Sequence, residues 1–355
     1  MHILMDLHQT LTIKSQRKYY IIKGGMLMGV KFKDITNPEP IEMKELEGKI
    51  LTVDASNVIY KFLSSMRQTD GTPLRDLNGH ITSHLNGIMF QTSTLIEKDI
   101  KPVYVFDGKA PDLKKETQEE RINIKKESEK KYLEAKEVGD VVAARKYAAR
   151  TTHLNKEIIK SSKKLLDLMG IPYVQARTEG EAQASYMVSQ NDAWAVVSQD
   201  YDCLQFGATR MIRNLKLSKS NSKNLELISL EKTLKELNLT REQLVDVAML
   251  VGTDFNKGVY GIGAKKGIKL IHKYGTLEKA LESLNETMEV DAELIREIFL
   301  NPNVVHNYTI EFKRPKKSQL LDFLCGEHDF DERRTISAIK KLQAKTAQSS
   351  LEDWF

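Results

Sequence analysis

Cysteine is scarce in this sequence, and long apolar runs are missing from it. The two cysteines, Cys203 and Cys325, stand far apart among 355 residues and fit no metal-binding spacing, which argues against a cysteine-ligated metal and indicates a reducing interior. No apolar stretch approaches the length of a membrane span, so no membrane partner is expected. The formal net charge is only +5, so a surface for an acidic partner must be a local patch.

Length and composition fit a soluble globular protein. The chain is 41% hydrophobic and 29% charged, and its 355 residues suffice for one large domain or two ordinary ones. Residues 1–27 carry neither a signal peptide nor a capped helix face, and a second start, MGVKFKDI, follows at Met28. We therefore expect residues 1–27 to be a start-site artefact or a disordered extension.

One short acidic stretch, VVSQDYDCL at 196–204, stands out. The apolar run 193–197 predicts a buried strand that ends in Asp200 and Asp202. Alternate residues of an extended segment point the same way, so both acids can face one spot. Two desolvated anions side by side repel unless a cation lies between them. The alternative is a polar turn with an Asx cap.

Similar acids end other predicted strands. KILTVDAS ends in Asp54, KPVYVFDG ends in Asp107, and the strand IPYVQA leads into TEGEAQAS with Glu179 and Glu181. Helical patterns separate these strands, and TRMIRNL and LELIS predict two more short ones. The alternation predicts an α/β fold, a mostly parallel central sheet flanked by helices, with its ligand site at the carboxyl ends of the strands.

Two further segments have distinct compositions. Residues 109–150 are rich in charges of both signs, with no Gly or Pro from 112 to 138, and they predict a long polar helix broken at Gly139-Asp140. From Leu239 the chain is helical. The last helical stretch is expected to end at Lys345, before a polar tail with Leu351, Trp354 and Phe355.

A glycine-rich hairpin lies within the helical region that starts at Leu239. Gly258, Gly261 and Gly263 predict a tight turn between two helices. Lys265, Lys266 and Lys269 lie in the first turns of the second helix, where backbone N–H groups bind phosphate well. A merely tight connection between helices is an equal alternative.

Carboxylates thus recur at the ends of predicted elements, namely Asp54, Asp107, Glu179, Glu181, Asp200, Asp202 and Asp254. Hard oxygen ligands in this number suit Mg²⁺ or Mn²⁺, and they suggest two ions with further acids orienting waters. Two such ions clamp the attacking and leaving oxygens of a phosphoryl displacement. No Walker-type loop, nucleophile elbow or Gly-x-Gly-x-x-Gly is present, so hydrolysis of a phosphodiester by metal-activated water fits best.

Five motifs in order resemble the flap endonucleases of archaea and eukaryotes: VDASNVIYKFL, VFDGKAPDLK, TEGEAQAS, SQDYDCLQFG and VGTDFNKGVYGIGAKK. The resemblance covers residues 28–355. It implies a PIN-like 5′ nuclease fold with a nuclease region at 28–125, a helical arch at 109–150 that a single-stranded 5′ flap threads, and a nuclease region at 150–340. A helix–two-turn–helix motif would occupy 250–275 and a flexible tail 341–355.

The resemblance also implies roles for individual residues. Asp54, Asp107, Glu179 and Glu181 would surround one metal ion, Asp200 and Asp202 the other, and Asp254 would act through water. Lys114 and Arg121 would neutralise the scissile phosphate. The DNA contacts would come from Tyr60, Arg67, Gly261, Gly263, Lys265, Lys266 and Lys269, with a K⁺ ion at the hairpin. By pattern alone, Tyr60 reads as a core residue, and Lys114 and Arg121 as solvated ones.

The tail implies a protein partner. Gln348, Leu351, Trp354 and Phe355 are similar to the box by which this family binds the sliding clamp. The family further implies a monomer located in the cytoplasm and nucleoid, or in the nucleus if the source is eukaryotic. Its substrate would be branched DNA with a 5′ flap, cut during Okazaki-fragment maturation and repair.

Three alternatives are open on the sequence. The first alternative, within the same superfamily, is a 5′ exonuclease or a bubble-cutting nuclease. The uninterrupted arch and the terminal clamp box argue against both. A clamp adaptor without catalysis would have lost acids, and none is lost. A small-molecule phosphohydrolase would leave the arch and the glycine hairpin without a role.

Overall fold

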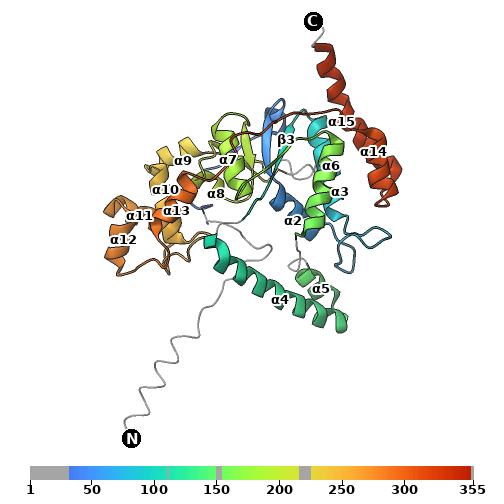
Figure 1. Ribbon diagram of the computed structural model, residues 1–355. Coiled ribbons are helices and arrows are strands. Elements are labelled where there is room, and N and C mark those ends of the chain that lie inside the picture. Colours follow the sequence, from blue (N-terminus) through green and yellow to red (C-terminus); the bar gives the residue numbers. More distant parts are fainter. Residues whose placement is uncertain (1–31, 110–111, 149–153, 216–224, 353–355) are drawn as a thin grey trace.

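A seven-stranded sheet forms the centre of the molecule, in the order β1-β7-β6-β5-β2-β3-β4 (Figure 1). The computed structural model describes residues 32–109, 112–148, 154–215 and 225–352. Strands β2 to β6 pair in parallel, while β7 pairs antiparallel with β6 and with β1 at one edge. The strands are β1 Glu39–Pro40, β2 Ile50–Asp54, β3 Lys101–Phe106, β4 Tyr173–Gln175, β5 Ala195–Val197, β6 Arg210–Arg213 and β7 Glu226–Ser229. The predicted α/β fold with a mostly parallel sheet is confirmed.

Two apolar cores lie on opposite faces of this sheet. Successive side chains of β3 alternate between them: Val103 and Val105 enter one core, and Tyr104 and Phe106 enter the other. Both faces of the inner strands are therefore buried, which explains their continuous apolar runs. Among the described helices, none is long and apolar enough to cross a membrane.

Helices cover each core. The first core is covered by α7 Gly180–Ser189, α8 Asp202–Gln205, α9 Leu230–Leu237, α10 Arg241–Val251, α11 Ala264–Tyr274, α12 Leu277–Leu284 and α13 Ala292–Leu300. The second core is covered by α2 Ala55–Ser65, α3 Ser83–Glu97, α6 Lys156–Met169, α14 Lys317–Leu321, the π-helical turn η5 Asp322–Gly326 and α15 Glu332–Glu352. Figure 1 shows α2, α3 and α6 on one side of the sheet and α7 and α8 on the other.

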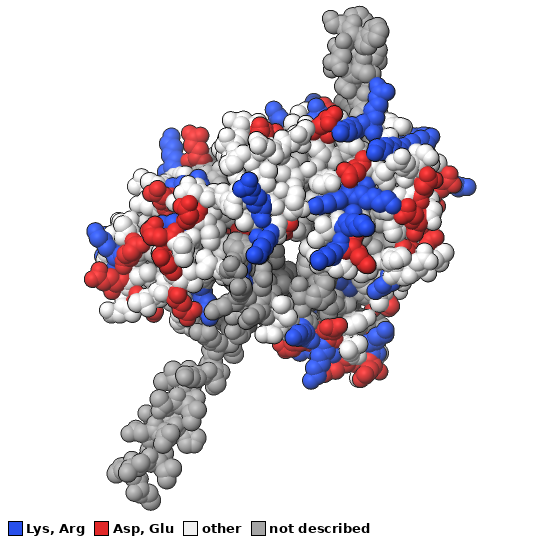
Figure 2. All heavy atoms as spheres, in the orientation of Figure 1, with Lys and Arg blue, Asp and Glu red and all other residues white. Residues whose placement is uncertain are grey.

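The charged segment forms a helical pair that projects away from the sheet (Figure 1). A short 3-10 turn, η2 Asp112–Lys114, precedes α4 Lys115–Glu137, and α5 Val141–Ala148 packs back on α4. Gly139 has a φ of +73°, which a glycine adopts without strain, and it ends α4 at the predicted place. Lysine and acidic side chains stand side by side on this pair (Figure 2).

The last helix departs from the expectation. It was predicted to end at Lys345, but α15 continues to Glu352. Ala344, Ala347 and Gln348 favour helix and no Gly or Pro interrupts the stretch, so intrinsic propensity favours a longer helix than predicted. Backbone atoms of Gln348 and Leu351 lie in this extension. The side chains of these two residues are outside the described atoms. Trp354, Phe355 and residues 1–27 lie wholly outside the described part of the chain.

Candidate active site

The predicted carboxylates gather along one edge of the sheet. Four neighbouring parallel strands, β5, β2, β3 and β4, end at this edge. Asp54 is the last residue of β2, Asp107 follows β3, Glu179 and Glu181 start α7 after β4, and Asp200 and Asp202 follow β5. The seventh acid, Asp254, follows α10 and reaches the same place, because Lys114 contacts both it and Glu179.

Glu181, Asp200 and Asp202 form the tightest group. One carboxylate oxygen from each lies within 4.8 Å of the others. The geometry behind this differs from the prediction, since Asp202 is the first residue of α8 and not part of an extended segment. The Asp200 carboxylate accepts the Asp202 backbone N–H (3.2 Å), as in an Asx cap. Asp200 and Asp202 therefore lie close together as predicted, but the start of α8, and not an extended strand, places Asp202 there.

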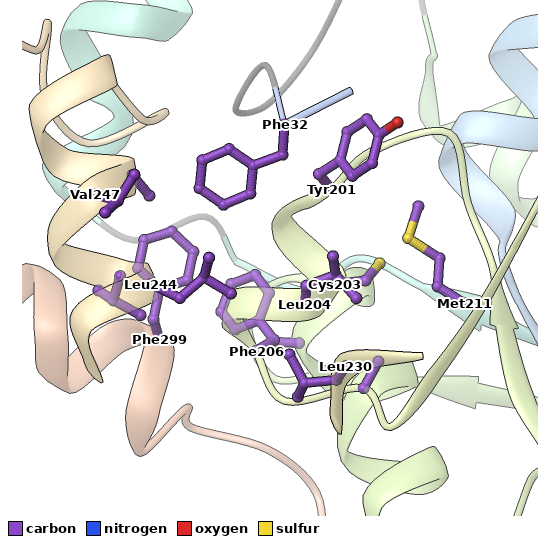
Figure 3. Close-up of a cluster of buried hydrophobic side chains, with 14 of the residues drawn as sticks. Phe32, Tyr201, Cys203, Leu204, Phe206, Met211, Leu230, Leu244, Val247 and Phe299 are labelled. Carbon is purple, nitrogen blue, oxygen red and sulfur yellow. The ribbon is translucent and has the colours of Figure 1, made fainter. Parts of the chain in front are cut away.

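Hydrophobic packing fixes the short helix that carries Asp202. Cys203 and Leu204 are fully buried, and Phe206, just after α8, lies against Phe299 of α13 with ring centroids 4.8 Å apart. Figure 3 shows these side chains in one cluster with Leu244 of α10. The acids thus stand on a rigid support, which a site that must hold ions at fixed separations requires.

Asp54 and Asp107 are oriented by backbone donors. Asp54 caps α2 by accepting the Asn57 N–H (3.1 Å), and Asp107 accepts the Gly180 N–H (2.7 Å). A Cβ at Gly180 would come within 2.9 Å of the Asp107 carboxylate, so glycine permits the close approach of α7 to β3. Each carboxylate retains an oxygen that these backbone bonds do not use.

Lys114 lies inside the cluster. Its ammonium forms ion pairs with Glu179 and with Asp254 (3.0 Å), and it lies 5.3 Å from the centre of the Phe255 ring. Glu179 occupies the N-cap position of α7 without capping it, so its carboxylate is available to the lysine. Only 17% of the Lys114 side chain is exposed, which rejects the view of an ordinary solvated lysine.

Burial and mutual repulsion set the charge state of the acids. Burial first, and then the neighbouring Asp107, raises the pKa of Asp54 to about 7. Burial and the charges of Asp200, Asp54 and Asp202 raise the pKa of Glu181 well above its usual range, and burial with Asp202 does the same for Asp200. Burial would lower the pKa of Lys114, but Glu179 and Asp254 more than offset this.

These shifts describe a site short of positive charge. One lysine faces a group of converging carboxylates, so the cluster favours further cations. The donors are all carboxylate oxygens, which suits Mg²⁺ or Mn²⁺ rather than a metal that prefers nitrogen or sulfur. The residues present therefore fit divalent metal binding. Glu181, which the resemblance assigned to the ion of Asp54, lies with Asp200 and Asp202 in the tightest group of carboxylates.

The predicted DNA-contact residues near the acids lie on α2 and just after it. Tyr60 is half-buried, neither core nor fully exposed, and it stands six residues, ~9 Å along the helix, beyond Asp54. The Arg67 guanidinium donates to the carbonyls of Ser64 (3.2 Å) and Gly71 (2.8 Å), which shapes the loop after α2. The backbone of Arg121 lies in α4, and its side chain is outside the described atoms.

The glycine hairpin connects α10 and α11 as predicted. Gly261 has a φ of +75°, and a Cβ at Gly261 or Gly263 would meet no atom within 4 Å. Gly263 caps α11 without a side-chain hydrogen bond. The side chains of Lys265, Lys266 and Lys269 are exposed. Uncapped N–H groups, open glycines and lysines together make a surface that an anionic backbone can approach closely.

Ser198 and Phe255 were not singled out from the sequence, although both contact the site. The Ser198 hydroxyl donates to Glu181 (3.1 Å) and accepts the Asp200 N–H (3.0 Å), which fixes these two acids relative to each other. Phe255 packs beside Lys114. Ser198 stands at a strand end two residues before an acid, so its position was a usable signal; nothing in the sequence marks Phe255.

Comparison with known proteins agrees with this geometry. Residues 28–128 match the XPG N-terminal domain and residues 170–254 the XPG I-region. The flap endonuclease 1 of Methanobrevibacter smithii is 53% identical over 329 residues, covering 92% of this chain and 100% of that protein. The Pyrococcus furiosus protein of the same name is 47% identical, covering 92% and 99%.

Solved structures resemble the chain over nearly all of its length. The flap endonuclease-1 structure from Methanococcus jannaschii superposes with a TM-score of 0.72 at 42% identity, covering 88% of this chain and 98% of that one. The catalytic core of Rad2 in complex with DNA substrate gives a TM-score of 0.69 at 24% identity, a likeness of fold alone. From its identity to full-length relatives, the chain belongs to the flap endonuclease 1 family.

Proposed function

We propose that this protein is a structure-specific 5′ flap endonuclease, with 5′–3′ exonuclease activity, that hydrolyses phosphodiesters during Okazaki-fragment maturation and DNA repair. The observation that carries the proposal is the convergence of seven carboxylates and one half-buried lysine at the carboxyl edge of a sheet. Family membership supports the flap specificity, since a relative with 53% identity is named flap endonuclease 1.

Two Mg²⁺ ions, or Mn²⁺ in their place, would supply a metal-activated water and charge stabilisation when bound. Asp54, Asp107, Glu179 and Glu181 would hold one ion and Asp200 and Asp202 the other. Glu181 lies within 4.8 Å of Asp200 and Asp202, so it would also be suited to contact the second ion. Asp254, which pairs with Lys114 at 3.0 Å, would act through water.

Lys114 and Arg121 would neutralise the scissile phosphate. The Lys114 ammonium is held among the acids, so it is already desolvated where negative charge develops in the transition state. Arg121 follows seven residues later on α4, and its side chain lies outside the described atoms. A single-stranded 5′ flap would pass through the helical arch and so reach Lys114 and Arg121.

Contacts to DNA would fix the junction rather than read its sequence. Tyr60 and Arg67 on and after α2 would contact the strand near the cut. Gly261, Gly263, Lys265, Lys266 and Lys269 would bind the duplex backbone, with a K⁺ ion at the hairpin. The protein would work as a monomer inside the cell.

A panel of substrates tests this function. With Mg²⁺, we expect rapid cleavage of a 5′-flap duplex, slower cleavage of nicked DNA, and none of a 3′ flap or bubble of equal length. Without Mg²⁺, all cleavage should stop, and binding should weaken steeply as salt rises, because phosphate contacts release counterions. Preferential cutting of the bubble would refute flap specificity, and full activity in chelator would refute the metal mechanism.

The C-terminal residues would bind a sliding clamp through Gln348, Leu351, Trp354 and Phe355. Deleting residues 348–355 is expected to abolish stimulation of cleavage by the clamp while leaving clamp-free activity unchanged, because the carboxylate site is built from residues up to 254. Steady-state rates with and without clamp provide the measurement. A variant with Glu352 and Asp353 changed to alanine, which keeps the apolar anchors, is the control. Equal stimulation of the deletion and the parent would exclude this assignment.

A further inference from the structure

A second cluster of metal-ligand side chains lies outside the carboxylate site. Asp76 and His80 belong to the loop between α2 and α3, and His328 lies in the turn between η5 and α15, 252 residues further along the chain than Asp76. One ligand atom from each lies within 4.8 Å of the others. Nothing in the endonuclease mechanism uses these three residues.

Distances in the cluster fit a small divalent ion. The Asp76 Oδ2 atom lies 3.1 Å from His80 Nδ1 and 2.8 Å from His328 Nδ1. In a tetrahedral site with metal–ligand bonds of ~2.0–2.1 Å, neighbouring ligand atoms are ~3.3 Å apart. The two distances from Asp76 differ from this value by a few tenths of an ångström, and one nitrogen of each ring lies within 4.8 Å of the other. A neutral imidazole needs only to move its proton from Nδ1 to Nε2, so no proton must be lost.

The ligands are already oriented by other contacts. The second Asp76 oxygen, Oδ1, accepts the His80 backbone N–H (2.8 Å), which leaves Oδ2 directed at the two rings. The His328 ring packs edge-on against Phe323, with centroids 4.9 Å apart. Supporting interactions of this kind fix the ligands of protein metal sites before the metal arrives.

Charge gives the cluster a reason to bind a cation. The Asp76 side chain is 0% exposed, and its contacts come from the two imidazoles and the His80 backbone. A carboxylate that is buried away from water is stabilised by a cation beside it. The His80 side chain is 61% exposed and provides access from solvent.

We propose that Asp76, His80 and His328 bind one divalent transition-metal ion of the zinc type, with water as the fourth ligand. Two imidazoles favour such an ion over Mg²⁺, which prefers oxygen. The ion would tie the loop after α2 to the turn before α15, where the Leu77 N–H already donates to Asp329 (2.7 Å). This site is independent of the proposed nuclease function.

Zinc titration of the full-length protein tests the proposal. The protein is stripped with a chelator and titrated with Zn²⁺ in excess Mg²⁺, which occupies the oxygen-only sites, and bound zinc is counted after equilibrium dialysis. The parent should bind one tight equivalent. His80→Gln and His328→Gln should each weaken it by about 100-fold or more, since even supporting residues of metal sites change affinity by ~10–100-fold. Co²⁺ should give the visible spectrum of a tetrahedral, nitrogen-ligated site in the parent but not in His80→Gln or His328→Gln.

His306→Gln is the matched control, because His306 is an exposed histidine whose Nδ1 bonds to the Tyr186 hydroxyl (2.9 Å) outside the cluster. It should bind zinc like the parent. Because His80 is largely exposed, His80→Gln should fold normally, and circular dichroism checks this. Equal zinc stoichiometry and affinity in parent and His80→Gln would overturn the proposal and leave the cluster a hydrogen-bonded link between two loops.

Discussion

Replacing Asp200 with asparagine is expected to slow cleavage of a 5′-flap duplex by about 10³-fold or more at saturating Mg²⁺, because a catalytic metal supplies several kcal/mol and each ~1.4 kcal/mol is tenfold in rate. Asp200, Asp202 and Glu181 bring their carboxylates within 4.8 Å. The amide keeps the size of the side chain and can still accept the Asp202 N–H, but it removes one negative charge from the ion position.

Binding of the junction should change little in this variant. The contacts proposed for duplex DNA come from the hairpin before α11 and from α2, and neither is held by Asp200. The measurements are single-turnover cleavage and fluorescence anisotropy on the same flap substrate in Mg²⁺ and in Ca²⁺. Asp34→Asn, at an exposed turn before β1, is the control and should match the parent. Parent-like turnover would exclude Asp200 as a metal ligand, and lost binding would instead indicate a misfolded site.

The location of the acids was predictable because one rule of parallel sheets controls it. Three of the apolar runs are followed by an acid, and the carboxyl ends of parallel strands meet at one edge. Asp54, Asp107 and Asp200 therefore had to converge if these strands were neighbours. These apolar runs do not predict the order of the strands in the sheet. The order β5-β2-β3-β4 depends on how helices pack on both faces, and it turns separate strand ends into one site.

Features that depend on distant segments could not be predicted from local pattern. His328 reaches Asp76 from 252 residues away, and neither the spacing nor the composition of the two segments marks them as partners. The same holds for Lys114, whose helix looks solvated in sequence, although its ammonium joins α7 to the turn after α10. The end of α15 was missed for another reason, since the helix propensity of residues such as Ala344 and Ala347 was not taken into account.

Changing Lys114 to methionine is expected to reduce the single-turnover rate of flap cleavage by ~10²–10³-fold at saturating Mg²⁺, the size typical of losing one preorganised group that stabilises transition-state charge. Methionine retains the apolar stem beside Phe255 but removes the ammonium that pairs with Glu179 and Asp254. Because those two acids lose a competing cation, the Mg²⁺ concentration for half-maximal rate should stay the same or fall.

The direction of the metal dependence separates two roles for this lysine. If Lys114 only compensates the charge of Glu179 and Asp254, saturating Mg²⁺ will replace it and restore the parent rate, which would contradict our prediction. If it acts on the scissile phosphate, the defect persists at every Mg²⁺ concentration. Rates measured across a Mg²⁺ titration distinguish these outcomes. Lys126→Met is the matched control, because Lys126 is exposed on α4, and its loss should leave the saturated rate unchanged. A slow step that no metal concentration rescues would therefore place the Lys114 ammonium at the reacting phosphate.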